Sequence, residues 1–133
     1  MARVTAKTQY ALLAALDLAE HYDGDKPVKL REIAVRTDVP SNYLVHILLS
    51  LKSRALVNSI RGPKGGYWLI RPPRSITVAE VVAAVEPRRP SRRRESGGAQ
   101  ALVDRLLSEA DARGWEYLAG LTLEQALQRR GGP

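Results

Sequence analysis

The sequence contains no cysteine and no phenylalanine, and only two tryptophans and one methionine occur among its 133 residues. Without a thiol the chain can form no disulfide, no thiolate metal site and no cysteine nucleophile. Apolar residues still make up 44% of the chain, so a core can form, and it must be built from leucine, alanine, valine and isoleucine. The length allows one domain, or a small domain with an appended helical arm.

A long apolar run is also missing. The apolar stretch at residues 10–19 is too short to span a bilayer and is followed by charged and polar side chains. It also lacks the small-residue cleavage pattern of a secretory signal. We therefore expect a cytoplasmic protein with no membrane partner.

Acidic residues are scarce relative to basic ones. The chain has 21 Lys and Arg against 14 Asp and Glu, a formal net charge of +7. The excess lies in the first part, where residues 1–76 carry 12 basic and 6 acidic side chains, whereas residues 98–133 carry 4 and 5. This balance indicates a polyanionic partner for the first part of the chain.

Residues 30–53 have the pattern of a helix-turn-helix. A two-turn helix at 30–36 ends at the breakers of residues 37–40, and a longer helix follows, with Ser41 as its expected N-cap. Four side chains of the longer helix recur at positions i, i+3, i+4 and i+7 and should face the core: Leu44, Ile47, Leu48 and Leu51.

The opposite face of the longer helix holds candidate DNA-contacting side chains. It presents Asn42, Val45, His46, Leu49, Lys52 and Ser53, with Ser41 and Tyr43 at the leading end, where a recognition helix touches base edges. A surface helix with a merely solvated polar face would give the same pattern. This helix alone therefore does not decide between the two interpretations.

A predicted hairpin follows at once. Residues 56–61 and 67–71 have strand composition and flank a tip with three glycines, which permit the positive φ of a tight turn. After a helix-turn-helix, such a hairpin is a wing. Its cations Arg61 and Lys64 could reach a minor groove or the adjacent phosphates, or they could simply keep the hairpin soluble.

One further helix is expected before the helix-turn-helix and hairpin, and another after them. Thr5 can cap a first helix that ends near His21, and the cations Arg3 and Lys7 at its start could approach a phosphate. Thr77 and Glu80 form a capping box that opens a short helix at 78–85.

Several segments together resemble the IscR, NsrR and CymR family of bacterial winged-helix regulators, also called the Rrf-two family. The similarity covers residues 1–87. It is carried by Thr8-Gln9-Tyr10-Ala11-Leu12, Leu30-Arg31-Glu32-Ile33-Ala34, Ser41-Asn42-Tyr43-Leu44, Arg61-Gly62-Pro63-Lys64-Gly65-Gly66-Tyr67 and Ile76-Thr77-Val78.

The resemblance implies a mainly α fold with a small β-hairpin wing and a long C-terminal dimerisation helix. It further implies a homodimeric, sequence-specific DNA-binding transcription regulator, with double-stranded DNA as the partner. The residues it assigns to the groove-facing start of the recognition helix are Ser41, Asn42, Tyr43, Val45 and His46, and it assigns Arg61 to the minor groove.

The chain also departs from this family. Many relatives bind an iron–sulfur cluster through three cysteines after the helix that here ends at Glu86, and this chain has none, so a cysteine-ligated cluster is excluded. We expect no cofactor and no metal.

Val45 stands where several relatives have a carboxylate, so it could make only an apolar contact, such as with a thymine methyl. Lys29 replaces a small hydroxyl cap. Ala55 replaces a helix-ending glycine, and an alanine forced into the left-handed region costs roughly 1 kcal/mol.

The remaining chain is expected to divide into a basic flexible loop at 87–98 and a helical tail at 99–133, after a DNA-binding domain at 1–86. The five arginines at 88–94 fit either a solvated linker or an auxiliary phosphate clamp. An apolar stripe along the tail predicts a helix of roughly twenty residues that pairs with a second subunit. Thr122 and Gln125 should cap a last helix at 123–129, and residues 130–133 should fray.

An enzyme is not expected, because His21 and His46 lie on different predicted helices and no acid, base and nucleophile can be assembled around either. A winged-helix adaptor that regulates through a partner protein is the alternative function. The operator sequence, the choice between activator and repressor, and a small-molecule or protein effector stay open.

Overall fold

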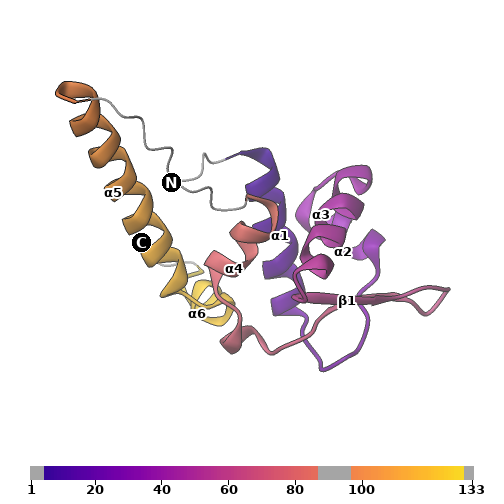
Figure 1. Ribbon diagram of the computed structural model, residues 1–133. Helices are drawn as coiled ribbons and strands as arrows, with labels where there is room; N and C mark the ends of the chain where they lie inside the picture. Colours follow the sequence, from indigo (N-terminus) through magenta and orange to yellow (C-terminus); the bar gives the residue numbers. More distant parts are fainter. Residues whose placement is uncertain (1–4, 87–96, 131–133) are drawn as a thin grey trace.

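The computed structural model of the chain describes residues 5–86 and 97–130. It is mainly α-helical with one two-stranded hairpin, as the sequence predicts (Figure 1). The elements in chain order are α1 (Ala6–Glu20), α2 (Leu30–Thr37), α3 (Ser41–Ser53), β1 (Val57–Ile60), β2 (Gly66–Leu69), the 3-10 turn η1 (Pro73–Ser75), α4 (Val78–Val85), α5 (Ala99–Ala119) and α6 (Leu123–Gln128).

Helix α1 is the centre of the core. It packs against α2, α3, α4 and α6, and its inner face is built largely of alanines that are at most 1% exposed: Ala11, Ala14 and Ala15. Such small side chains let neighbouring helices approach closely. The predicted core stripe of α3 is confirmed, since Leu44, Ile47, Leu48 and Leu51 are all buried.

Three helix starts have the predicted capping residues. The Thr5 side chain accepts a hydrogen bond from the Thr8 amide at the start of α1. Thr77 with Glu80 and Thr122 with Gln125 form complete capping boxes at α4 and α6.

The prediction for Ser41 is wrong by one residue. Pro40 is the N-cap of α3, and Ser41 is the first helical residue, with no side-chain cap bond at this end. The backbone of Pro40 is extended (φ −57°, ψ 135°), and its carbonyl oxygen accepts from the amides of Tyr43 and Leu44. Because proline fixes φ near this value, it takes the capping position without a side-chain acceptor.

The hairpin pairs β1 with β2 in antiparallel register, with Val57 opposite Leu69. A further rung was not predicted: Val28 and Tyr67 exchange two backbone hydrogen bonds of 2.8 Å. Gly66 is required beside this rung, because a Cβ there would collide with the backbone of Val28. The loop before α2 therefore anchors the base of the wing.

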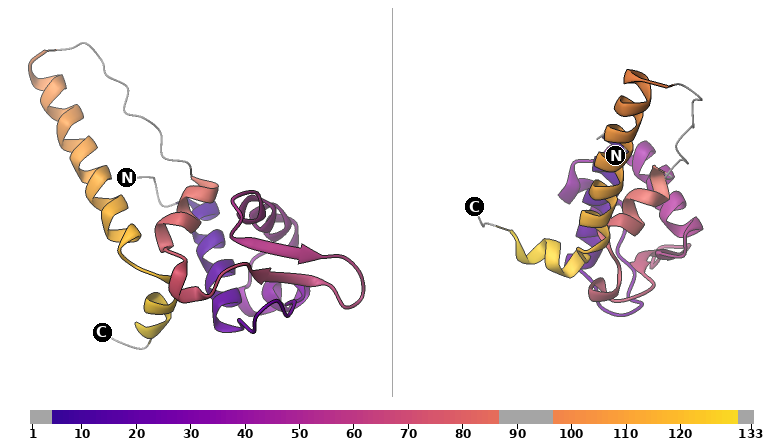
Figure 2. Two further views of the ribbon diagram at one scale, coloured as in Figure 1. Left: turned by 60° about the horizontal axis from the view of Figure 1, so that its bottom comes forward. Right: turned by 60° about the vertical axis from the view of Figure 1, so that its left-hand side comes forward.

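Helix α5 connects to the core near its C-terminal end, and α6 packs against α1. Trp115 of α5 and Leu123 of α6 are buried with the helices of the core, and the Val78 amide donates to the Leu121 carbonyl at 2.8 Å. The first half of α5 extends beyond the other described elements (Figure 2). No helix within the described ranges is long and apolar enough to cross a membrane.

The expectation that the chain frays from residue 130 is wrong for Arg130 itself. Its guanidinium donates to both carboxylate oxygens of Glu20, at 2.6 and 2.8 Å. These hydrogen bonds lower the pKa of Glu20. The contact ties the end of α6 to the end of α1, which sequence reasoning could not see because 110 residues separate the partners.

Candidate nucleic-acid interface

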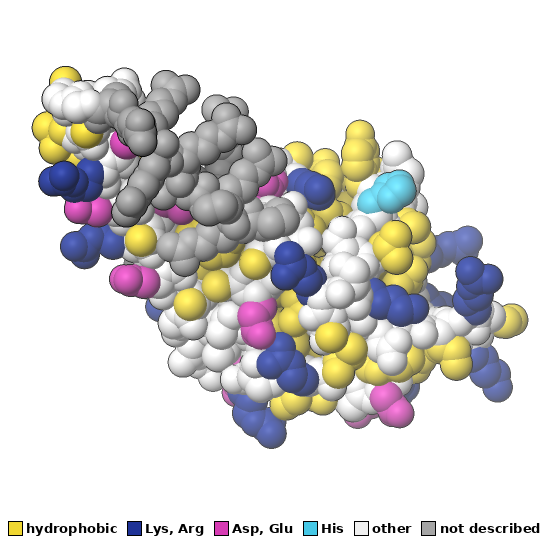
Figure 3. Space-filling view, in the orientation of Figure 1, with side chains coloured by type: hydrophobic (Ala, Val, Ile, Leu, Met, Phe, Trp, Pro, Cys, Tyr) yellow, Lys and Arg dark blue, Asp and Glu magenta, His cyan; other side chains and the backbone are white. Residues whose placement is uncertain are grey.

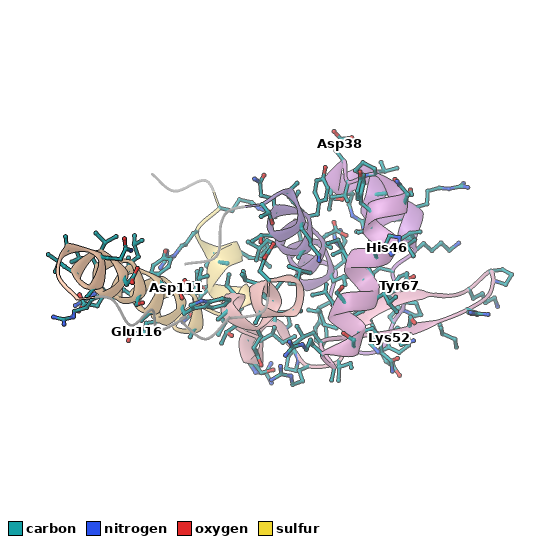
Figure 4. All side chains as sticks on the ribbon, turned by 45° about the horizontal axis from the view of Figure 1, so that its top comes forward. Asp38, His46, Lys52, Tyr67, Asp111 and Glu116 are labelled. Carbon is teal, nitrogen blue, oxygen red and sulfur yellow. The ribbon has the colours of Figure 1, made fainter. Side chains whose placement is uncertain are left out.

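The candidate interface is the surface formed by α3 and the hairpin. Figure 4 labels His46 and Lys52 along α3, next to the strands, whereas Asp111 and Glu116 lie on α5 on the other side of the molecule. Helix α3 can turn its polar side outward because its apolar stripe is fixed in the core. The hairpin follows directly and lies beside it.

The structure exposes all the described candidate residues. Tyr43 is 55% exposed and Val45 43%, and the other candidates in the described ranges are exposed as well: Lys7, Ser41, Asn42, His46, Lys52, Arg61 and Lys64. Arg3 lies outside the described residues. Their role in binding DNA stays a prediction.

An aromatic contact braces the leading end of α3. The ring of Tyr43 lies against that of Tyr10 from α1, with centroids 5.9 Å apart and planes tilted by 46°. Tilted aromatic pairs at this distance attract each other. Tyr10 therefore limits the orientations of Tyr43, a role that was missed because the two residues belong to separate helices.

A second contact links α3 to the wing. The Lys52 ammonium donates a 2.8 Å hydrogen bond to the Ser59 hydroxyl of β1. Ser59 was not a candidate, since only its cross-element neighbour gives it a role. The bond holds a cation at the junction of helix and hairpin.

A groove of about 460 Å³ runs between α3 and the hairpin. Its described lining includes three cations, Lys29, Lys52 and Arg61, and no acidic residue. Lys29 is the N-cap of α2, makes no side-chain cap bond, and was noted in the sequence only as a departure from the family. The groove is therefore positively charged along the part that the structure describes.

The excess of basic over acidic residues extends from α3 to the end of the hairpin. Residues 41–69 contain four basic residues and no acidic one: Lys52, Arg54, Arg61 and Lys64. In Figure 3 dark blue side chains surround the hairpin on the right-hand side of the view. A surface of this kind attracts a polyanion.

An ion pair behind the interface holds α2, the first helix of the helix-turn-helix, against α1. Asp17 of α1 is 7% exposed and accepts two hydrogen bonds from the Arg36 guanidinium of α2, at 2.8 and 3.0 Å. These bonds raise the pKa of Arg36. Bidentate pairing fixes the orientation of α2 as well as its distance from α1.

The chain is similar to known transcription regulators along nearly its whole length. The profile of the Rrf2 (Rrf-two) family, described as an iron-dependent transcriptional regulator, matches residues 4–129. The regulator IscR of Xenorhabdus nematophila is 34% identical over 96% of this chain and 80% of that protein. An rrf2-like HTH-type regulator of Rhodobacter capsulatus is 41% identical over 85 residues, 62% of this chain and 57% of that protein.

A solved structure gives the same result. T. potens IscR superposes with a TM-score of 0.78 and 30% sequence identity, covering 96% of this chain and 87% of that one. The agreement includes the helix-turn-helix, the hairpin and the long helix that follows.

The described donor residues do not fit the iron of the family description. A cysteine-ligated cluster has no ligands here, because the sequence holds no cysteine. Residues 5–86 and 97–130 also contain no group of three His, Cys, Asp or Glu side chains that could hold a metal.

The fold, the cationic surface and the similar proteins all indicate the same family. The relatives are described as transcription regulators, and the family resemblance seen in residues 1–87 is confirmed over residues 4–129. The chain belongs to the Rrf2 family of winged-helix, DNA-binding transcription regulators.

Proposed function

We propose that this chain is a homodimeric transcriptional repressor that binds a palindromic operator through α3 and the hairpin, without an iron–sulfur cluster. The observation that carries the proposal is the acid-free, basic surface of residues 41–69. A repressor of this kind acts by occupying DNA that RNA polymerase needs.

In the proposed complex α3 enters the major groove. Asn42 and His46 lie one helical turn apart on its exposed side and can hydrogen-bond to base edges. Arg61 enters the flanking minor groove, and Lys64 at the hairpin tip meets phosphates. Lys7, at the start of α1, and Arg3 are further proposed phosphate contacts.

The second subunit is proposed to pack on α5. Five of its large apolar side chains are 46–65% exposed: Leu102, Val103, Leu106, Leu107 and Tyr117. A row of this length needs a cover, and α5 carries four acidic and two basic residues, which disfavours DNA as the cover. A second copy supplies the same apolar row, and the resulting twofold axis matches a palindrome with half-sites about one helical turn apart.

The arginines at 88–94 lie outside the described residues, so their use as a phosphate clamp stays a prediction. The division into segments 1–86, 87–98 and 99–133 also stays a prediction.

The proposal is tested by the salt dependence of binding to duplex DNA, followed by selection from a random duplex library. A regulator should lose affinity steeply with salt, by about 0.9 in the logarithmic slope for each phosphate contacted, and should enrich a palindrome. Binding that is absent or independent of salt would support the adaptor function instead.

A further inference from the structure

Two apolar side chains of α3 lie exposed beside the cationic groove. Val45 is 43% exposed and Leu49 is 62% exposed, both on α3. Water contact at such side chains is unfavourable, and a phosphate backbone offers them nothing better. Their position on a DNA-binding face therefore calls for an apolar target on the DNA itself.

The two side chains act from one side of α3. They are four residues apart, so they lie one above the other along the helix, separated by a rise of about 6 Å. Both line the groove between α3 and the hairpin. Two base-pair steps cover about the same distance, at about 3.4 Å each.

The cations that line the groove favour one kind of partner with apolar groups over another. Lys29, Lys52 and Arg61 line the same groove as the two apolar residues, and no acidic residue is among its described lining. An apolar protein surface would leave these cations without counter-charges. DNA supplies phosphates at the edges of the major groove and apolar groups at its floor.

Major-groove chemistry narrows the target to one group. Among the four bases only thymine presents an apolar substituent there, the C5-methyl. The methyl of 5-methylcytosine occupies the equivalent position on the ring. Valine and leucine have no hydrogen-bonding atoms in their side chains, so they can distinguish bases only through such a methyl.

We propose that Val45 and Leu49 read pyrimidine C5-methyl groups, so that each half-site of the operator carries methylated pyrimidines at two positions about two base pairs apart. This inference rests on the proposed DNA-binding function and specifies what its recognition helix reads. Thymine and 5-methylcytosine share the recognised group, and the test separates them.

The test starts from the best duplex selected by the full-length protein from a random library. Each thymine is replaced in turn by deoxyuridine, which removes only the methyl, and affinity is measured by fluorescence anisotropy. Loss of one buried methyl corresponds to about a fourfold weaker affinity. Matching replacements in both half-sites should weaken binding by about 16-fold. The effect at one position should vanish in Val45→Ala and at the other in Leu49→Ala.

A matched control is Val35→Ala, since Val35 is 77% exposed on α2 and does not line the groove. It should keep the full sensitivity to deoxyuridine. Placing 5-methylcytosine opposite guanine at a sensitive position should bind more tightly than cytosine there if the methyl alone is read. An advantage for thymine over deoxyuridine without this gain would identify thymine as the only source.

The inference is overturned if a sequence is enriched but no deoxyuridine replacement weakens binding by more than twofold. It is also overturned if the sensitivity persists unchanged in both alanine variants. The replacement series uses the unaltered protein, so it decides the matter even if a variant does not fold. Failure to enrich any sequence would instead contradict the proposed function, and the inference with it.

Discussion

Helices α3 and α5 both expose apolar side chains, but their electrostatic surroundings differ. Residues 41–69, from α3 to the end of the hairpin, hold four basic and no acidic residues, whereas α5 holds two basic and four acidic ones. On α3, Val45 and Leu49 are exposed beside a cationic groove and Tyr43 at the leading end; on α5 the exposed apolar residues form a long row. Apolar exposure alone does not identify a partner, and the neighbouring charges are the reason that we propose DNA for the first surface and a second subunit for the other.

The largest effect is expected from a charge placed in the apolar row of α5. Leu106→Glu places a charge in the apolar row and should convert the dimer to a monomer, measured by analytical ultracentrifugation. Operator affinity should fall by about 100-fold or more, because the two half-sites no longer benefit from linkage. The control is Ser108→Glu, which adds the same charge at an exposed residue outside the row. A dimeric Leu106→Glu variant would refute the subunit role of α5.

The next effect concerns the wing. Arg61→Ala should weaken binding to the selected operator by about 10-fold, since it removes the cation proposed for the minor groove. The matched control is Arg74→Ala, an exposed arginine in η1, which should change affinity by less than about twofold. Equal affinities for Arg61→Ala and the unaltered protein, measured by fluorescence anisotropy, would show that the wing does not contact DNA through Arg61.

Substitutions at the proposed base-contacting residues should lower the preference for the operator over other duplexes. Asn42→Ala and His46→Ala should each reduce the preference for the selected operator over scrambled duplex by about 10-fold, because each removes a donor or acceptor facing a base edge. Competition binding at one salt concentration measures this ratio. If the preference stayed at its original value in both variants, base readout would have to come from other residues.

A smaller effect distinguishes phosphate contacts from base contacts. Lys64→Ala should weaken all duplexes about equally, and the logarithmic salt slope should become shallower by about 0.9 for each Lys64, or about 1.8 for a dimer. Titrations at several salt concentrations give the slope. A loss confined to the operator would show that Lys64 reads sequence.

The smallest expected effect concerns the stability of the turn between α3 and β1. Ala55, between α3 and β1, has a φ of 58°, so Ala55→Gly should stabilise the fold by about 1 kcal/mol. The expected rise in Tm is about 3–5 °C, with DNA affinity unchanged. Ser108→Gly, within α5, should instead destabilise by about 0.5 kcal/mol. A lower Tm for Ala55→Gly in thermal unfolding would contradict the strain.

Local patterns predicted most of the fold. The capping boxes at Thr77 and Thr122 depend on residues three apart, and the core stripe of α3 depends on helical spacing, so both are visible in the sequence. The left-handed position at Ala55 followed from comparison with a family that has glycine there, and φ confirms it.

Contacts between distant segments could not be predicted. The Val28–Tyr67 rung, the Tyr10–Tyr43 pair and the Lys52–Ser59 bond each join elements whose relative placement depends on the packed core. The cap of α3 was misassigned for a different reason. Serine is a common N-cap, but the backbone of the preceding Pro40 already has the capping conformation.

The central claim is that DNA meets α3 and the hairpin while α5 meets a second copy. Hydrogen–deuterium exchange of the full-length dimer, with and without the selected duplex, tests it most directly. The account predicts that DNA slows amide exchange within residues 41–69 and leaves α5 unchanged, since its partner is present in both states. Slower exchange in α5 with no change in residues 41–69 would contradict it.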